Sequence, residues 1–231
     1  MHIKLFEYLV KKKMIGEQQA VISRIQSGNV NCFLVECGEN AILVDTVKES
    51  GKSKILEICE NKNIRLIVLT HGHFDHAQNA SFLSEHFNAP IAMHELDIPL
   101  IENNLSQELF AHTITGKLVL YASIHSMKNE KLPQFSPSVL LKEGDRLDEY
   151  GIPASIVELP GHTKGSIGVM VNGNGKEFIV GDALMHMLGS AGRSLLYTDR
   201  KMMDESAEKI SRSGASMIHF GHGDSCSNKD W

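Results

Sequence analysis

Short apolar runs separated by turn residues fill the first part of the chain. The runs AVISRI (20–25), NCFLVECG (31–38) and NAILVD (40–45) are each typical of a β-strand, and Gly38, Glu39 and Asn40 make a tight connection between the last two. Strands joined by such short turns pair with their neighbours in sequence. The pattern therefore predicts an antiparallel meander.

The hydrophobic period then alternates between helix and strand. Residues 51–61 carry apolar side chains at helical spacing, and RLIVLT (65–70) is a continuous apolar run of the kind found in buried strands. These two segments, together with 40–45, predict a βαβ-like unit. A second helix is predicted over residues 77–87, ending before an Asn-Ala-Pro sequence, and IAMH (91–94) is predicted as another short strand.

A helical insertion is predicted from about 97 to 133, with 105–110 and 117–127 as its strongest helical segments. After it the strand pattern returns in 138–141, 155–159, 167–171 and 177–180, with a hairpin turn at 172–175, followed by a helix at 204–213 and a last strand at 216–220.

Strands and helices thus alternate in two halves of the chain. Each half has a meander followed by helices, so two sheets packed face to face with helices outside satisfy both halves. We expect one domain over residues 1–231, of the α+β class, because sandwiches of this kind reach about 200 to 250 residues as a single unit.

The amino-acid composition limits the classes of function and of partner that are expected. Hydrophobic residues make up 42% of the 231 residues and charged residues 22%, which is typical of a globular protein with a large core. The net charge of −5 lacks the basic excess that holds a phosphate backbone, so nucleic acid is not expected as a partner. Neither a membrane-spanning run nor a cleavable leader is visible at the N-terminus, and we expect a cytoplasmic protein that contacts no membrane.

The cysteines do not indicate a zinc ribbon or a disulfide framework. Cys32, Cys37, Cys59 and Cys226 include no Cys-x-x-Cys pair, so we expect reduced thiols in the core or at its edge.

Histidine and aspartate side chains, which can bind metals, follow directly after several of the predicted strands. His71 follows 65–70 directly, and Pro-Gly-His162, Gly-Asp182 and Gly-His222 follow later strands. Glycine has no Cβ, so the chain can turn sharply and present the next side chain at the sheet edge. In the extended stretch after Thr70, His71 and His73 point to the same side and can bind one cation.

The candidate ligands are more numerous than a single metal site needs. His71, His73, His76, His162 and His222, with Asp75 and Asp182, outnumber the three or four protein groups that a single catalytic zinc uses. Two metals fit this set.

The motif THGHFDH (70–76) matches the HxHxDH signature of the metallo-β-lactamase-fold superfamily. PGHTKGS, IVGD and FGHG match the remaining metal motifs of that family in order and in approximate spacing. The chain is therefore identified as a member of this superfamily, and the resemblance implies a four-layer αβ/βα sandwich.

The resemblance also implies the metal ligands. One ion would be bound by His71, His73 and His162, a second by Asp75, His76 and His222, and Asp182 would bridge the two. Asp45 matches an acidic position that orients a ligand histidine from behind. The donors suit two divalent ions, zinc first, although iron or manganese would also bind them.

The activity implied is hydrolysis of a small ester, thioester or lactone by a hydroxide that bridges the metals. Two divalent ions, two aspartates and that hydroxide leave a site charge of about +1, which favours a neutral or anionic small-molecule substrate. The ligand set resembles glyoxalase II without the C-terminal helical domain, and Met185 stands where related lactonases carry a tyrosine.

Three alternatives stay open on the same residues. They are a phosphodiesterase or RNA-processing enzyme, a sulfur dioxygenase with a single iron, and a metal-binding module without catalysis.

The other histidines receive structural interpretations by default. His2, His86, His112 and His125 are expected at the surface, and His94 and His219 in structural roles within or at the end of strands. His186 is a candidate for the substrate pocket, together with Met185 and Met187.

Asp75 is the candidate catalytic residue, because a carboxylate beside the hydroxide can carry a proton to the leaving group. We expect Asp75→Asn to lose turnover or metal, measured by activity assay and by metal quantification. A variant with both metals and full turnover would contradict this role.

Overall fold

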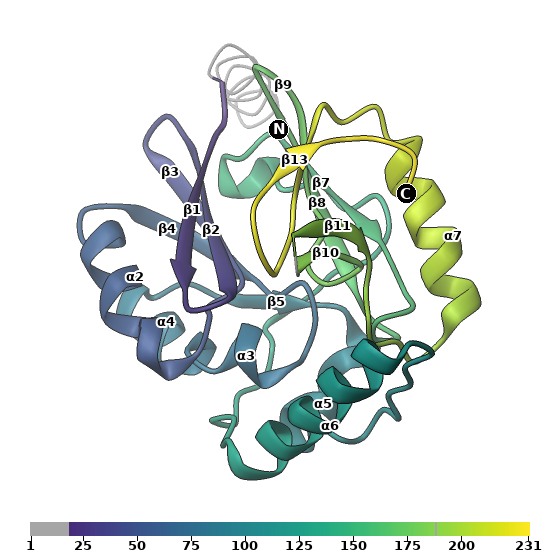
Figure 1. The fold of residues 1–231 in the computed structure, drawn as a ribbon. Coiled ribbons are helices and arrows are strands. Elements are labelled where there is room, and N and C mark those ends of the chain that lie inside the picture. Colours follow the sequence, from purple (N-terminus) through teal and green to yellow (C-terminus); the bar gives the residue numbers. More distant parts are fainter. Residues whose placement is uncertain (1–18, 188) are drawn as a thin grey trace.

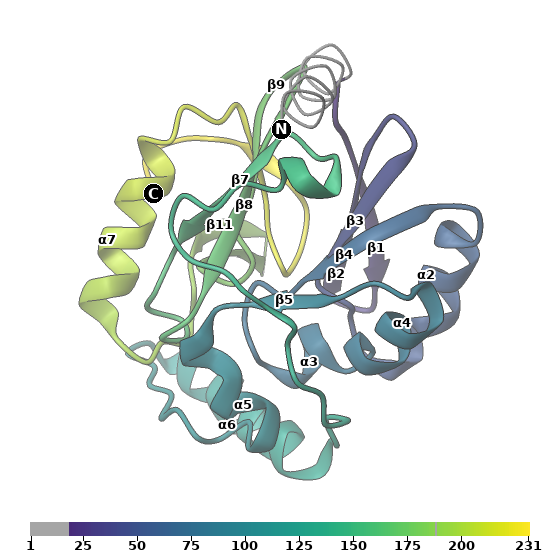
Figure 2. The ribbon, with the colours of Figure 1, turned by 180° about the vertical axis from the view of Figure 1, so that it is seen from behind.

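Two β-sheets pack face to face in the computed structural model, and helices cover the outer face of each sheet (Figure 1). The structure describes residues 19–187 and 189–231, so the expectations for the N-terminal segment and for His2 lie outside the described residues. The layers follow the order helix, sheet, sheet, helix when seen from either side (Figure 2). The predicted α+β sandwich is confirmed.

The first sheet has the strand order β1-β2-β3-β4-β5-β6. These strands are β1 (Val21–Ser27), β2 (Val30–Cys37), β3 (Asn40–Val44), β4 (Asn63–Val68), β5 (Ile91–Met93) and β6 (Val139–Leu140). The first three pair antiparallel, which confirms the meander, and β3 to β6 pair parallel. Helix α2 (Lys52–Cys59) connects β3 to β4, so the βαβ unit is also present.

The second sheet has the order β13-β12-β9-β8-β7. Its strands are β7 (Ala154–Glu158), β8 (Ile167–Gly173), β9 (Gly175–Ile179), β12 (Met217–His219) and β13 (Cys226–Ser227). The predicted hairpin between β8 and β9 is confirmed, with Gly173 paired to Gly175. The sequence pattern missed a separate two-stranded sheet, β10 (Leu184–Met187) and β11 (Ser190–Arg193).

Alternating side chains on the strands build the layers. In β2, Phe33 and Val35 pack between the two sheets, whereas Cys32 and Leu34 pack under the outer helices. Strand β8 divides its side chains in the same way between the central layer and the layer beneath helix α7 (Arg200–Ser211). Burial on both faces explains why so many strand runs are almost continuously apolar.

Helices α2 and α4 (Ala80–Phe87) cover the first sheet, and α7 covers the second (Figures 1 and 2). Helix α7 begins four residues before the predicted 204–213 because Asp199 caps it, its side chain accepting a hydrogen bond from the N–H of Met202. Three short 3-10 turns complete the helical elements of the described chain: η1 (Glu49–Gly51), η2 (Glu95–Asp97) and η3 (Asp148–Tyr150).

The helix predicted over 77–87 is confirmed as α4, although it begins three residues later than predicted. The chain forms two helices, α3 (Phe74–Ala77) and α4, which are separated at Gln78 and Asn79. The amide of Asn79 donates to the carbonyls of Thr46, Val47 and Lys48, and the amide of Gln78 donates to the carbonyl of Lys131. These tertiary hydrogen bonds fix the turn at Gln78 and Asn79, and the hydrophobic period does not report them.

The helix predicted at 105–110 is wrong. The helices of this region are α5 (Ile98–Glu102) and α6 (Ile114–Asn129), and the segment between them is irregular. Gln107 donates to the carboxylate of Asp97 and to the carbonyl of Leu96, and Phe110 forms an isolated bridge with Tyr197. Contacts with the rest of the fold therefore override the local helical pattern.

Strand direction determines where the functional residues lie. Strands β3 and β4 run parallel, as do β9 and β12, so their carboxyl ends meet at one edge of each sheet. Helices α5 and α6 lie beyond that edge (Figure 1). The cysteines are free thiols, as expected, and no helix among residues 19–187 and 189–231 has the length and apolar character needed to cross a membrane.

Candidate metal centre

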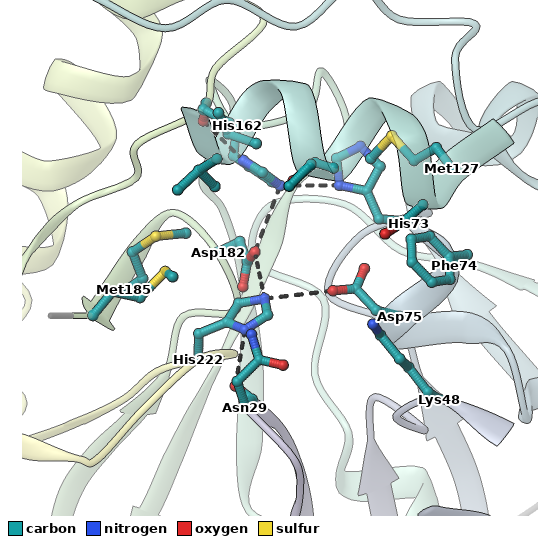
Figure 3. A pocket seen from close by; sticks show the side chains of 16 residues that line it. Asn29, Lys48, His73, Phe74, Asp75, Met127, His162, Asp182, Met185 and His222 are labelled. Atoms are coloured by element: carbon teal, nitrogen blue, oxygen red, sulfur yellow. Dashed lines mark hydrogen bonds and ion pairs between the residues drawn. The ribbon is translucent and has the colours of Figure 1, made fainter. Parts of the chain in front are cut away.

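The structure brings all the predicted metal ligands together at that edge of the two sheets. Figure 3 shows the five that line the cavity there, namely His73, Asp75, His162, Asp182 and His222. His71 and His73 follow β4, and Asp75 and His76 lie in α3. The other three each follow a strand of the second sheet: His162 follows β7, Asp182 follows β9, and His222 follows β12. Residues more than a hundred positions apart thus converge on one site.

The first cluster consists of His71, His73 and His162, all buried. Nδ1 of His73 lies 3.0 Å from Nε2 of His162. The ring of His71 stands edge-on to the other two, with centroid separations of 4.8 and 4.9 Å. Three imidazole nitrogens this close provide the donor set that one cation needs.

The second cluster consists of Asp75, His76 and His222. Nε2 of His222 lies 3.4 Å from Nε2 of His76 and 3.6 Å from a carboxylate oxygen of Asp75. Asp182 stands between the clusters, because its Oδ2 is 3.2 Å from Nε2 of His222 and 3.7 Å from Nε2 of His162. A carboxylate at this position can reach a cation in either cluster.

Acceptors behind the rings fix the orientation of three histidines. Each Nδ1 faces one acceptor at 2.9 Å: Asp45 for His76, the carbonyl of Leu196 for His162, and the carbonyl of Asn29 for His222. A main-chain carbonyl cannot donate a hydrogen bond, so the Nδ1 that faces it must carry the proton. The lone pair of Nε2 then faces inward.

Asp45 makes further contacts from the same buried position. It accepts hydrogen bonds at 2.8 Å from the N–H and from the hydroxyl of Thr70. That hydroxyl also lies 3.1 Å from Nδ1 of His71. Asp45 therefore joins the strand that precedes the first cluster to a histidine of the second, which is the location expected for it from the sequence.

Burial and neighbouring charges divide the imidazoles into two kinds. Burial, and then the adjacent His162, lower the pKa of His73 to about 3. Burial also disfavours the charged form of His76, but the carboxylates of Asp182 and Asp45 outweigh it and raise the pKa of His76 to about 10. The site thus combines a neutral ligand nitrogen with carboxylates that require positive charge beside them, and divalent cations meet both demands.

Unpartnered atoms support the same fit. Within the part of the chain that the structure describes, Nε2 of His71 and Oδ1 of Asp182 are buried without a hydrogen-bond partner. Each such atom costs about 1–3 kcal/mol. Cations bound by these side chains would use the imidazole and carboxylate lone pairs that the protein leaves without donors.

Glycine is needed at two strand ends for different reasons. Gly181, before Asp182, has a φ of 53°, which other residues rarely adopt. Gly221, before His222, needs space instead, because a Cβ there would collide with the carboxylate of Asp182 and the ring of His76. The second glycine permits the close approach of the two ligand loops.

Asp97 is a site residue that the sequence pattern did not reveal. Its buried carboxylate accepts hydrogen bonds from the N–H of Gly72 at 3.0 Å and of Gly165 at 2.8 Å, from the hydroxyl of Thr163 at 2.7 Å and from the amide of Gln107 at 2.9 Å. One carboxylate therefore holds four donors drawn from three segments of the chain.

These contacts link the two ligand loops of the first cluster. Gly72 lies between His71 and His73, and Gly165 follows His162 by three residues. Most of the donors to Asp97 belong to the main chain or to ordinary polar side chains, so no motif accompanies it in the sequence. The sequence pattern places Asp97 only at the start of the predicted helical insertion.

A cavity of about 240 Å³ opens onto the clusters (Figure 3). Much of its wall is apolar, made by Phe74, Val119, Met127, Met185, Met187 and Leu196. Helix α6 contributes Ser123 and Ser126 as well. The expectation that the insertion forms part of the pocket therefore holds for α6.

His186 lies apart from the residues that line this cavity, unlike the neighbouring methionines on β10. Its Nδ1 lies 2.9 Å from the carbonyl of Asp224, and its ring contacts Phe220. Alternating side chains on β10 explain the difference, because Met185 and Met187 share the face opposite to that of His186.

The remaining described histidines have structural surroundings. His94 pairs with Glu158 at 3.3 Å, and His219 pairs with Glu177 at 2.8 Å. The other three, His86, His112 and His125, are exposed. Cys226 packs at the edge of the core beneath α7 and does not join the clusters.

Comparison with known proteins identifies similar chains. The family model of the metallo-beta-lactamase superfamily matches residues 26–222. Hydroxyacylglutathione hydrolase GloC of Haemophilus influenzae is 31% identical over 169 residues, which cover 71% of this chain and 70% of that protein. A probable metallo-hydrolase of Methanocaldococcus jannaschii is 27% identical over 67% of this chain and 66% of its own length.

A solved structure, TTHA1623 in a di-iron-bound form, superposes with a TM-score of 0.62 at 26% identity. The match covers 90% of this chain and 94% of that one.

Asp97→Asn should loosen the first cluster, because its amide group would face N–H donors that the carboxylate now accepts. We expect metal affinity to fall about 10- to 100-fold and the free energy of unfolding to fall by about 2 kcal/mol. Competition with a chromogenic chelator and urea unfolding measure the two effects. Asp204→Asn is the control, since Asp204 forms an exposed pair with Arg193. Wild-type metal affinity in Asp97→Asn would exclude the linking role.

Proposed function

Because the chain belongs to the metallo-beta-lactamase superfamily and is a metal-dependent hydrolase, we propose that it cleaves small thioesters at a pair of divalent cations. The observation that carries the proposal is the position of Asp182 between two clusters of donors at the base of one cavity. Hydrolysis of a thioester adds water across the C–S bond and yields a carboxylate and a thiol.

The residues divide between the two cations as the sequence resemblance implies. His71, His73 and His162 would hold one, Asp75, His76 and His222 the other, and Asp182 would contact both. Cations so held lower the pKa of water toward neutrality and polarise the acyl oxygen of a substrate. The donors are nitrogen and oxygen only, which suits zinc, and the related di-iron structure supports iron as the other candidate.

Asp75 is the most accessible carboxylate of the centre. Its side chain is 19% exposed, against 6% for Asp182, and it lines the cavity beside Phe74. This position supports its assignment as the group that carries a proton to the leaving thiol, because no other carboxylate in the lining has similar access.

The cavity supports a small substrate. A volume of about 240 Å³ is below the range of about 300–1,000 Å³ that is usual for pockets holding drug-sized ligands. The apolar wall suits a short acyl chain. Similarity to GloC supports a thioester rather than another acyl bond. Met185 lines the cavity without a hydroxyl, so a lactonase mechanism that uses a phenol there is not supported.

We expect the purified protein to bind two equivalents of metal and to hydrolyse thioesters with a kcat/KM at least about tenfold above that for lactones and phosphodiesters. Metal quantification and an assay panel of the three substrate classes measure this. Asp182→Asn should lose metal and turnover together, because the carboxylate contacts both clusters.

His219→Asn is the matched control, since His219 is a buried histidine outside both clusters. One equivalent of iron with oxygen consumption, or two metals without turnover of any panel member, would contradict the proposed function.

Helix α6 should select substrates by size. We expect Ser123→Phe to lower the ratio of kcat/KM for butyryl over acetyl thioesters about tenfold, because the ring would occupy space that the longer acyl chain needs. Leu118→Phe is the control, since Leu118 lies on the same helix and is 68% exposed. Metal content should not change in either variant. An unchanged ratio in Ser123→Phe would show that α6 does not contact the acyl group.

A further inference from the structure

The cavity has one charged residue outside the candidate metal centre. Its titratable lining residues are His73, Asp75, His162, Asp182, His222 and Lys48, and only the last is not a predicted ligand. Lys48 lies in the connection after β3 and reaches toward the side chains of Asp75 and Phe74 (Figure 3). This lysine gives the lining of the cavity a positive charge that does not belong to the candidate metal centre.

The ammonium of Lys48 forms no ion pair with a carboxylate in residues 19–187 or 189–231. Its Nζ lies 5.1 Å from the centre of the Phe74 ring. Asp75 interacts instead with His76 and His222, whose imidazoles lower the pKa of Asp75 although burial opposes this. Within the described part of the chain, the lysine charge is therefore left for a ligand.

The backbone of this connection is held in an unusual conformation. Asp45 has a φ of 64° and Val47 a φ of 49°, which for a β-branched residue is a true outlier. The buried amide of Asn79 donates to three successive carbonyls, the last being that of Lys48 at 2.8 Å. The carbonyl of Lys48 also accepts from the N–H of Gly51 at 2.8 Å.

Strained backbone persists only where surrounding contacts enforce it, and such positions concentrate at functional sites. The same connection directs Asp45 toward His76 and Lys48 toward the cavity. The base of the Lys48 side chain is thus fixed relative to the metal centre, and only its flexible stem adapts to a ligand.

We propose that Lys48 binds an anionic group on the thiol half of the substrate. This inference rests on the proposed function, in which Asp75 carries a proton to the leaving thiol, because Lys48 lies beside Asp75 in the cavity (Figure 3). The substrate class is then a short-chain acyl thioester of a thiol that carries a carboxylate or another small anion. The acyl chain packs toward the methionines and α6, and the anion pairs with the ammonium.

Butyryl thioesters of three thiols test the assignment. The thiols are 3-mercaptopropionate, its neutral amide and thiocholine, so charge varies while the acyl group stays constant. We expect the wild type to prefer the anionic ester over the amide about tenfold, mainly through a lower KM. Lys48→Met should abolish this preference, Lys48→Arg should retain it, and Lys48→Glu should favour the thiocholine ester.

Lys52→Met is the matched control. The ammonium of Lys52 also lies over an aromatic ring, 4.7 Å from the centre of Phe82, and it pairs with Glu49 outside the cavity. Its removal should leave the preference between the three esters unchanged. An equal loss of preference in Lys52→Met and Lys48→Met would mean a general effect of protein charge and would overturn the proposal.

Binding without turnover separates this proposal from the proposed function. The thioether 3-(butylthio)propanoate and its amide have no scissile carbonyl, and calorimetry with the metal-loaded protein gives their Kd values. We expect the wild type to bind the acid about tenfold tighter than the amide, and Lys48→Met to bind both alike. If no thioester is cleaved, the proposed function fails while this measurement still decides the role of Lys48. Equal affinity of wild type and Lys48→Met for the acid would overturn that role.

Discussion

Burial of five imidazoles and two carboxylates against one another is the interaction on which the rest of the structure depends. Acceptors behind His76, His162 and His222 hold protons on their outer nitrogens, so the inner nitrogens face the cluster, and those of His76 and His222 lie 3.4 Å apart. Buried acceptors that face one another without a donor are unfavourable. Such a cluster persists only where positive charge is bound among its members and where rigid elements prevent the rings from turning away. Metal affinity and fold stability are therefore coupled in this protein.

The sandwich provides this rigidity through the direction of its strands. Parallel strands deliver their carboxyl ends to one edge, and each ligand loop begins where a buried strand stops. The loops are then tied to each other by carboxylates rather than by apolar packing. Asp45 joins Thr70 to His76, and Asp97 joins the first ligand loop to the loop that carries His162. Both carboxylates are fully buried, which makes their hydrogen bonds strong and their removal costly.

The sequence was sufficient to single out the residues that converge at this edge, because their positions follow from strand ends and glycines, which are local features. Gly181 illustrates this, since its φ of 53° turns the chain sharply just before Asp182. Asp97, Asn79 and Lys48 escaped prediction because their partners are main-chain groups or a cavity formed by distant segments. The break between α3 and α4 and the irregular segment at 105–110 have the same origin. In each case an amide side chain binds carbonyls far away in sequence, and hydrophobic periodicity contains no trace of such bonds.

Two kinds of selectivity arise from the two sides of the cavity. Helix α6 has a single buried residue, Gly116, and its outer side chains Ile114, Leu118 and Tyr121 are largely exposed, so few contacts fix its inner face. Selection by substrate size can therefore change there without disturbing the metal ligands. Lys48 lies on the opposite, constrained side, where Asn79 holds its carbonyl and the adjoining backbone also carries Asp45. Movement of the backbone at Lys48 would shift the carboxylate of Asp45, which orients His76. Selection by charge is consequently coupled to the geometry of the metal centre, whereas selection by size is not.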